Sequence, residues 1–187
     1  MTNGIKSMTM DDISKMLNIS KKTLYKFFKD KDDIVCTLIL LDCAEDKFLY
    51  EQVAKKSDNA IDEIKEFTEI IIDKLKDVNP SLMYDMEKYH PKAYEIFQNH
   101  KRVEVYQSIK DNLDNGIKEG LYRKSLNTDI IAKLFSEKIE ILFNVELFPQ
   151  KIYTFREMYQ EMISYHLKGV VSEKGYNYLI KNKLKQN

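Results

Sequence analysis

The stretch from residue 9 to residue 34, TMDDISKMLNISKKTLYKFFKDKDDI, constrains the fold more than any other part of the chain. Thr9 can cap a first helix, because its hydroxyl accepts a hydrogen bond from an unpaired first-turn amide, and Asp12 completes a capping-box pattern. The two residues before Ser20 leave room only for a turn, after which Ser20 can cap a second helix. Asp30 can cap a third. The stretch therefore predicts two short helices joined by a tight turn and followed by a longer helix.

Apolar side chains recur at the spacing i, i+3 and i+4 in both short helices, which predicts one buried face on each. The predicted buried residues are Ile13, Met16 and Leu17 in the first helix and Leu24, Phe27 and Phe28 in the second. At about 100° per residue, four polar residues of the second helix fall on its opposite, outward face. They are Lys22, Tyr25, Lys26 and Lys29. The second helix is therefore expected to be amphipathic, with a cationic outer face.

This cationic character is local. Between residues 20 and 31 five lysines stand against one aspartate, whereas the whole chain has a formal net charge of zero. The chain as a whole is therefore not a generic polyanion binder. The major groove of DNA is about 12 Å wide and admits one helix, and its phosphates attract cations. The pattern fits a helix that reads DNA, and it equally fits an ordinary helical hairpin with a solvated lysine face.

The segment resembles the DNA-binding segment of the tetracycline-repressor (TetR) family. The resemblance rests on residues 9–13 and 20–31, where Thr-Leu-Tyr, Phe-Phe and the lysine after them fall in register. It covers about 25 of 187 residues, and the remainder is similar only in length and helical character. The resemblance implies a helix-turn-helix DNA-binding region over residues 1–45 and a helical effector-binding and dimerisation domain over residues 46–187.

The resemblance also implies which side chains contact a double-stranded DNA operator. Polar and cationic residues at the start of the first helix, on the second helix and at the start of the third match the family's positions. The implied phosphate contacts are Thr9, Lys21, Tyr25 and Lys31, and the implied base contacts are Lys22, Thr23 and Lys26.

Two features depart from the family's pattern. Phe27 stands where the family usually has a His or Tyr that reaches a phosphate, so one polar contact is expected to be absent. The family also places a full helix before the segment that begins at Gly4, and only three residues precede Gly4 here. Because that helix closes the small core of the DNA-binding region, we expect this core to be partly uncovered. A mis-assigned start, a truncation and a weakened DNA-binding region are all compatible with the sequence.

The rest of the chain is predicted to be all-α. It contains 5 Gly and 3 Pro among 187 residues, which favours long helices, and strand-like alternation is absent. No signal peptide and no run of about 18 apolar residues is visible, which predicts a cytoplasmic protein without a membrane span. About nine helices are expected. After the first two they cover about residues 30–55, 59–78, 81–89, 91–119, 127–148, 153–171 and 172–186.

The sequence carries no pattern typical of catalysis, of a cofactor or of a metal site. His90, His100 and His166 are scattered, and no His, Cys and carboxylate set has metal-ligand spacing. Cys36 and Cys43 would lie roughly 10 Å apart on one helix, too far for a disulfide, and are expected to be small core residues. We therefore predict a protein that is not an enzyme and needs no cofactor.

The predicted middle helices are rich in Met, Tyr and Phe, which provide adaptable apolar surface with an occasional polar group. Such residues either line a ligand cavity or simply fill the core. Given the resemblance, we expect nine of them to line a cavity for a small, largely apolar effector. The nine are Phe67, Met83, Tyr84, Met86, Tyr89, Phe97, Tyr106, Phe135 and Phe143.

The predicted helix over residues 127–148 has a wider apolar stripe than one neighbouring helix needs. The resemblance implies that the last two long helices pair with those of a second copy, although the same stripe would suit an intramolecular core. Two hypotheses follow. The first is a homodimeric DNA-binding transcriptional regulator, a repressor that a small-molecule effector releases from its operator. The second is a dimeric helical ligand-binding or protein-interaction module with a truncated, non-functional DNA-binding region.

Overall fold

The computed structural model describes residues 5–79 and 81–183, and these ranges contain helices but no strand. The first elements are a 3-10 turn, η1 (Ile5–Ser7), and two short helices, α1 (Met10–Met16) and α2 (Lys21–Phe27). They are followed by α3 (Lys31–Lys56), α4 (Ala60–Leu75), α5 (Leu82–Tyr89), α6 (Pro91–His100), the π-helix η2 (Lys101–Val105), α7 (Tyr106–Lys118), α8 (Thr128–Ile141), α9 (Phe155–Val170) and α10 (Glu173–Lys183). We call residues 5–30 the head and helices α3 to α10 the body.

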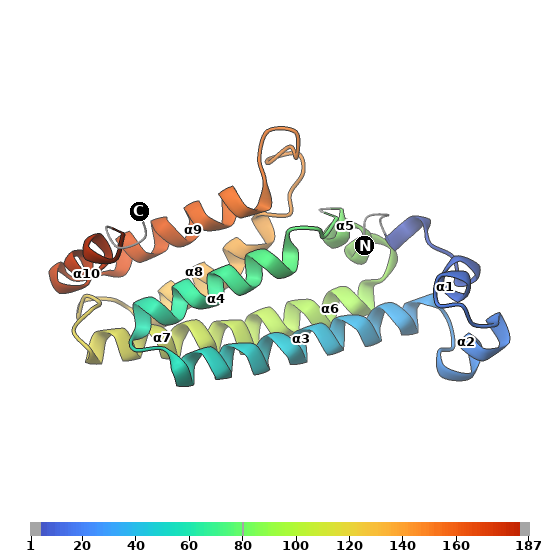
Figure 1. Ribbon diagram of the computed structural model, residues 1–187, viewed down its shortest axis with the longest axis horizontal. Coiled ribbons are helices and arrows are strands. Elements are labelled where there is room, and N and C mark those ends of the chain that lie inside the picture. The colour runs from blue at the N-terminus through green and yellow to red at the C-terminus, as the bar shows by residue number, and fades with distance from the viewer. Residues whose placement is uncertain (1–4, 80, 184–187) are drawn as a thin grey trace.

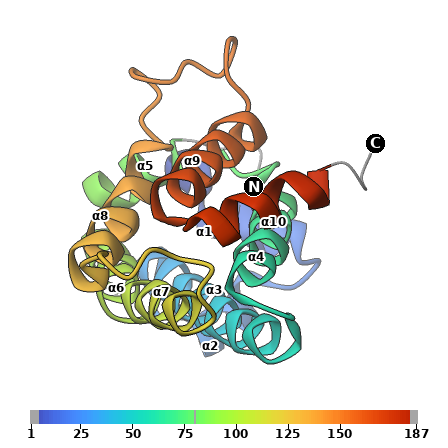
Figure 2. The ribbon, with the colours of Figure 1, turned by 90° about the vertical axis from the view of Figure 1, so that its left-hand side faces the viewer.

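The molecule is elongated, with the head at one end (Figure 1). Helix α3 starts at the head and runs along one edge to the far end, and α6, η2 and α7 lie beside it in the same direction. Helices α4 and α8 return towards the head, while α9 and α10 cover the opposite side. Seen along the long axis, these helices surround a common interior (Figure 2). At about 1.5 Å per residue, α3 is about 39 Å long and physically joins the head to the body.

Helix starts follow the predicted caps. Thr9 accepts from the Asp12 amide while the Asp12 side chain accepts from the Thr9 amide, which is the predicted capping box. Ser20 caps α2 through the Thr23 amide. The remaining predicted starts at Asp30, Asn59 and Asn127 are also confirmed by side-chain caps. Local hydrogen bonding therefore sets the boundaries of most helices.

Two of the predicted helices differ in the structure. The helix expected over residues 127–148 ends at Ile141, because the Asn144 side chain accepts from the amides of Glu146 and Leu147 and stabilises a turn instead. The single helix expected over residues 91–119 is interrupted by the π-helix η2. The predicted start signal Asn79-Pro80 and the end of the helix expected over residues 172–186 include positions outside the described residues.

The main core lies between α4, α7, α8 and α9. Ile61, Ile72 and Leu113 are fully buried in it. A second, smaller cluster joins Ile5 of η1 to Val35 of α3 and to α5 and α6. The head is thus attached to the body partly through an apolar contact that precedes its own helices.

The far end of the body is closed by Tyr122, whose side chain is almost completely buried. Its hydroxyl lies 3.1 Å from both the Ala60 carbonyl and the Asn112 side-chain oxygen. Its ring lies so close to Gly116 that an added Cβ would stand 2.2 Å from a ring carbon. Glycine is therefore required at position 116. Gly120, with a φ of +73°, follows the C-cap of α7 and turns the chain out of the helix.

The broad apolar stripe of α8 divides into two faces. Ile131, Phe135 and Ile139 point into the main core. Ile130, Leu134 and Ile141 are exposed and share one outward face. The stripe therefore serves the intramolecular core on one side and leaves an apolar surface on the other. Within the described ranges, no helix is sufficiently long and apolar to cross a bilayer.

Candidate functional sites

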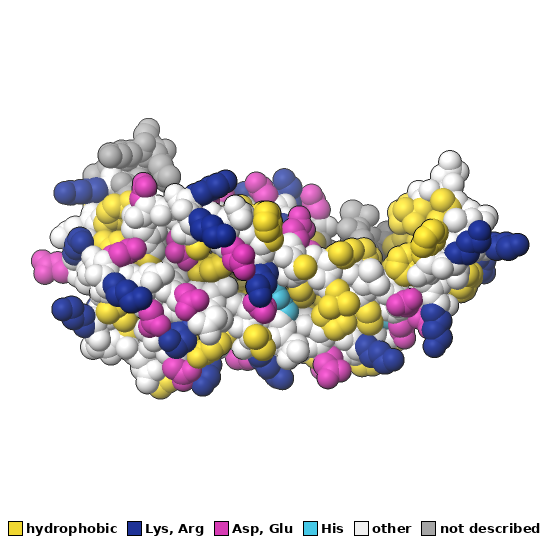
Figure 3. All heavy atoms as spheres, turned by 90° about the horizontal axis from the view of Figure 1, so that it is seen from below, with side chains coloured by type: hydrophobic (Ala, Val, Ile, Leu, Met, Phe, Trp, Pro, Cys, Tyr) yellow, Lys and Arg dark blue, Asp and Glu magenta, His cyan; other side chains and the backbone are white. Residues whose placement is uncertain are grey.

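The outer surface of α2 carries the predicted DNA-contacting residues. Lys22, Tyr25 and Lys26 are exposed. Thr23 is half-buried at the helix start, and its hydroxyl lies 2.8 Å from that of Ser20. Lysine side chains gather at the head end of the molecule, next to apolar side chains (Figure 3). The structure thus presents a short helix with cations on its free face.

The lysines of this surface are not equivalent. Lys21 forms an ion pair of 2.8 Å with Asp11 of α1. Lys31 donates to the Lys6 carbonyl at 3.3 Å. No ion pair involves Lys22 or Lys26 within the described residues. Their charges are therefore the most available to an external anion, whereas Thr9, whose hydroxyl donates to Asp12, is engaged in its own cap.

The apolar side of the head is incompletely covered. Leu24 is only 1% exposed, but Phe27 is 73% exposed, so the prediction that Phe27 is buried is wrong. Met16 and Leu17 are also mainly exposed, against their predicted burial. The physical reason is that two helices of seven residues each are too short to cover every apolar side chain between them. The expectation of a partly uncovered core is confirmed.

Contacts at the junction of α5 and α6 hold the head against the body. The side chain of His90, at this junction, is buried, and its Nδ1 lies 2.5 Å from Asp32 in the first turn of α3. The Lys6 amide donates to Asp85 at 3.4 Å, and the Lys6 ammonium lies 5.0 Å from the centre of the Tyr89 ring. These contacts link α5 and the α5–α6 junction directly to the start of α3 and to η1 of the head.

A cavity of about 130 Å³ lies inside the body between α3, α4, α6, α8 and α9. Its lining is mainly apolar. Six of the nine residues expected to line a cavity do so: Phe67, Met83, Met86, Phe97, Phe135 and Phe143. The structure therefore brings together residues from four separate helices, α4, α5, α6 and α8, and from the turn that follows α8.

The other three expected residues lie outside this lining. Tyr84 is exposed on α5 and its hydroxyl accepts from Lys88. Tyr89 lies beside the Lys6 ammonium, and Tyr106 donates to Asp129 at 2.7 Å. Their helices turn these rings to the surface, where each hydroxyl can meet water or a charged partner.

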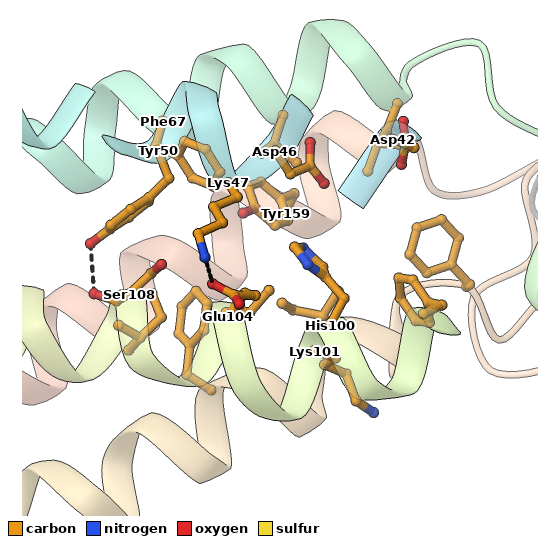
Figure 4. A pocket seen from close by; sticks show the side chains of 18 of the residues that line it. Asp42, Asp46, Lys47, Tyr50, Phe67, His100, Lys101, Glu104, Ser108 and Tyr159 are labelled. Carbon is orange, nitrogen blue, oxygen red and sulfur yellow. Dashed lines mark hydrogen bonds and ion pairs between the residues drawn. The ribbon is translucent and has the colours of Figure 1, made fainter. Parts of the chain in front are cut away.

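One end of the cavity also carries polar residues that sequence reasoning missed. Asp42, Asp46, His100 and Tyr159 line it, and Lys47 and Glu104 form an ion pair of 2.9 Å beside them (Figure 4). Burial raises the pKa of Asp46 and lowers the pKa of His100. Because these residues come from α3, α6 and α9, no local pattern in the sequence could identify them.

A buried hydrogen-bonded chain connects α3 with α4 and α7. The Tyr50 hydroxyl lies 2.5 Å from Glu63 and 2.6 Å from the Ser108 carbonyl, and Figure 4 shows the second contact. The Tyr50 hydroxyl is the donor in both contacts, so its one hydrogen is shared between the Glu63 carboxyl and the Ser108 carbonyl. Burial raises the pKa of Glu63, while its hydrogen bonds with Tyr50 and Asn112 act in the opposite direction.

Other titratable groups indicate no metal site. Among residues 5–79 and 81–183, no cluster of three His, Cys, Asp or Glu side chains could hold a metal ion. His166 packs edge-to-face against Phe135, and burial lowers its pKa to about 4. This histidine is therefore neutral at pH 7 and serves as part of the packing.

Comparison with known proteins identifies the head. The family model described as bacterial regulatory proteins, tetR family, matches residues 1–36. An uncharacterized HTH-type transcriptional regulator of Bacillus subtilis, YvaF, is 22% identical over 168 residues, covering 89% of this chain and 87% of the relative. These matches confirm the resemblance to the TetR family that was read from the sequence, and they support a DNA-binding transcriptional regulator.

Solved structures extend the similarity to the whole fold. A TetR-family transcriptional regulator from Agrobacterium tumefaciens is 14% identical with a TM-score of 0.73, covering 91% of this chain and 90% of the other. FadR from Bacillus subtilis, in complex with stearoyl-CoA, is 14% identical with a TM-score of 0.71, covering 89% of this chain and 91% of the other. At these identities the similarity establishes the all-helical architecture.

Proposed function

We propose that the protein is a homodimeric repressor that a small-molecule effector releases from its operator. The observation that carries this proposal is the path of α3. The helix begins at the head with its cap at Asp30 and continues without interruption past Asp42, Asp46 and Tyr50, which line the cavity. Occupancy of the cavity and orientation of the head are therefore linked through one rigid element.

In the proposed DNA complex, α2 enters the major groove. Lys22 and Lys26, which form no ion pair within the described residues, are the leading base contacts. Thr23 joins them if its hydroxyl leaves its contact with Ser20 and contacts a base instead. Thr9, Tyr25, Lys21 and Lys31 would hold phosphates, with Lys21 exchanging Asp11 for the DNA backbone. The domain division proposed at residue 45 falls inside α3, so the two regions share this helix.

The proposed dimer uses the outward face of α8 together with α9. Ile130, Leu134 and Ile141 form an exposed apolar stripe, and exposed Tyr165 of α9 lies next to Lys138 of α8 with 4.8 Å between ammonium and ring centre. An apolar surface of this kind is typical of a protein interface. Pairing it with a second copy would place two heads on successive major grooves, about 34–36 Å apart.

An effector would act through the helices that line the cavity. Met83 and Met86 of α5 and Phe97 of α6 line it, and the junction between these helices carries His90, which holds Asp32. A ligand that displaces α5 or α6 would shift this contact and tilt the start of α3. Such a tilt changes head spacing and therefore the population able to bind DNA.

Fluorescence anisotropy with DNA from immediately upstream of the protein's own gene tests operator binding, with unrelated DNA as the reference. We expect selective binding with two chains per site. Lys26→Ala should cost about 1–3 kcal/mol of operator binding if Lys26 contacts a base. Lys56→Ala, an exposed lysine at the far end of α3, is the matched control and should change little. Equal loss in both variants would contradict the proposed surface.

Sedimentation tests the dimer separately. Leu134→Lys places a charge in the proposed interface and should yield monomers, because a buried unpaired charge is costly. Leu41→Lys changes an exposed leucine of α3 in the same way and should leave the dimer intact. A dimer that survives Leu134→Lys would rule out this interface.

The alternative, a ligand-binding or interaction module with a non-functional head, is not favoured. The head matches the family's DNA-binding sequence, and its helices have complete N-terminal caps. The exposed apolar side of the head affects its stability more than it affects the surface proposed to face DNA. The reason is that the lysines lie on the other side of α2.

A further inference from the structure

Three polar groups converge on the cavity from three different helices. Asp46 comes from α3, His100 from α6 and Tyr159 from α9, and Figure 4 shows them around the same space. Tyr159 is almost fully buried, and the charge of Asp46 contributes to raising the pKa of its hydroxyl, which places the two groups near each other. They form the polar end of an otherwise apolar cavity.

These groups retain unused hydrogen-bonding capacity. Asp46 accepts from Lys74 at 2.5 Å through Oδ1. Among the residues that the structure describes, no hydrogen-bond partner reaches Asp46 Oδ2, the His100 ring or the Tyr159 hydroxyl. Polar groups inside a protein are normally satisfied, and those that are not point to a bound molecule or water. The cavity therefore offers acceptors to a ligand at this end.

The charges around this end favour a cation over an anion. Lys74 is shared by three carboxylates, Asp42 at 2.8 Å, Glu45 at 3.6 Å and Asp46 at 2.5 Å. The two lysines of the lining are also paired, Lys47 with Glu104 and Lys101 with Glu137 and Glu140. His100 adds no compensating charge, because its burial favours the neutral ring. Carboxylates thus exceed the ammonium groups available to them, and an anionic ligand would be repelled.

The size of the cavity limits the apolar part of the ligand. Its volume is about 130 Å³, and apolar protein cavities of about 150 Å³ hold benzene. Aromatic and branched side chains form most of the remaining lining. They include Phe67, Ile71, Phe135, Phe143 and Phe155. A single ring or a short alkyl chain fits this space, whereas a larger body would require the helices to separate.

We propose that the cavity binds a small organic cation, a one-ring or short-chain amine whose ammonium group donates to Asp46 Oδ2 while His100 and Tyr159 complete its hydrogen bonding. The inference rests on the proposed function, since it names the chemistry of the effector that the same cavity would bind. The ammonium replaces water at the acidic end, and the apolar body contacts the aromatic end.

Isothermal titration of the full chain with three one-ring compounds tests the proposal. Benzylamine is cationic at pH 7, ethylbenzene is a neutral molecule of nearly the same shape, and phenylacetate is anionic. We expect benzylamine to bind at least about tenfold more tightly than ethylbenzene, because one favourable charge–charge hydrogen bond corresponds to about that factor. Phenylacetate should bind more weakly than ethylbenzene.

Three variants test whether the preference arises from the polar groups of the cavity. Asp46→Asn keeps the shape and removes the charge, so benzylamine should fall to the affinity of ethylbenzene while ethylbenzene is unchanged. Glu45→Gln removes a carboxylate from the same lysine but lies outside the cavity lining, and it should retain the preference. Tyr159→Phe removes only a hydroxyl. It should weaken benzylamine severalfold without affecting ethylbenzene, and it provides a second route if Asp46→Asn does not fold.

Ile71→Phe, which fills the apolar end of the cavity, separates failure of this inference from failure of the proposed function. If ethylbenzene or phenylacetate binds as tightly as benzylamine and Ile71→Phe abolishes that binding, the cationic ligand is ruled out and the effector cavity stands. If no compound binds, or if binding survives Ile71→Phe, both the ligand class and the cavity as effector site are overturned.

Discussion

The head and the body are built from the same kind of amphipathic helix, but they differ in how completely the apolar faces meet. In the body, α4, α7, α8 and α9 enclose a core in which Leu113 is 0% exposed. In the head, α1 and α2 bury Leu24, while Leu17 remains 55% exposed. Local signals such as caps suffice to form the head's helices, but its stability depends on its attachment to the body. The region that contacts DNA is thereby the one most easily displaced.

The largest expected effect comes from the same substitution made once in each region. Leu113→Ala should lower the free energy of unfolding by about 3–5 kcal/mol, because it removes a fully buried side chain and leaves a cavity in packed surroundings. Leu17→Ala should cost less than about 1 kcal/mol, because much of its side chain already meets water. Urea denaturation followed by circular dichroism measures both.

Equal costs at the two positions would contradict the comparison. They would mean that Leu17 is covered in solution, and hence that the head's apolar side is closed. A matched control is Leu41→Ala on the exposed side of α3, which should resemble Leu17→Ala.

A second prediction concerns Leu24, the residue on which the head's own packing depends. Leu24→Ala should lower the free energy of local opening of residues 10–28 by about 2–3 kcal/mol. The amides of α4 and α7 should keep their protection from exchange. Hydrogen exchange read out residue by residue measures this difference. Loss of protection throughout the body would show instead that the two regions unfold as one unit.

The sequence predicted the head's helices well because their signals are local. Thr9, Ser20 and Asp30 each cap the helix that follows within a few residues, so no knowledge of distant contacts was needed. The burial of Phe27 was predicted wrongly because periodicity identifies an apolar face but not whether another helix covers it. The end of α8 was placed seven residues too late, since the turn stabilised by Asn144 competes with helix formation in a way that periodicity does not register.

The cavity was predictable only in part for a related reason. Its Phe and Met residues stand out by type, and six of the nine named residues line it. Asp46 and His100 lie on different helices with many other charged residues, and only the packing of α3 against α6 brings them together. The raised pKa of Glu63 likewise follows from its burial beside residues of other helices, among them Tyr50, thirteen residues earlier in the chain.

A third prediction uses that buried carboxyl to separate the body from the head by pH. The pKa of Glu63 is raised in the folded chain, chiefly by burial and further by the charges of Glu119 and Asp111. Its contribution to stability is therefore complete below the unfolded pKa of about 4.5 and is lost as the pH rises through the folded pKa. Glu63→Gln keeps an oxygen that can accept from Tyr50 but cannot ionise.

The free energy of unfolding of the native chain should therefore fall relative to Glu63→Gln as the pH rises, by at most about 1.4 kcal/mol per pH unit. Urea titrations of both chains between pH 4 and 8 measure the difference, in which the other titrating groups cancel. Parallel curves would show that the pKa of Glu63 is not raised in the folded chain.

The smallest expected effect is at Phe27, and it tests the head most directly. If the side chain were buried as its spacing suggests, Phe27→Ala would cost about 3–5 kcal/mol. Because the side chain is 73% exposed, we expect a change of less than about 0.5 kcal/mol in the local stability of residues 10–28 by hydrogen exchange. A cost near 3 kcal/mol would mean that another segment covers Phe27 in solution. Leu24→Ala and Leu17→Ala would then become similarly costly, and the difference between head and body would lie in what covers their helices rather than in how well those helices pack.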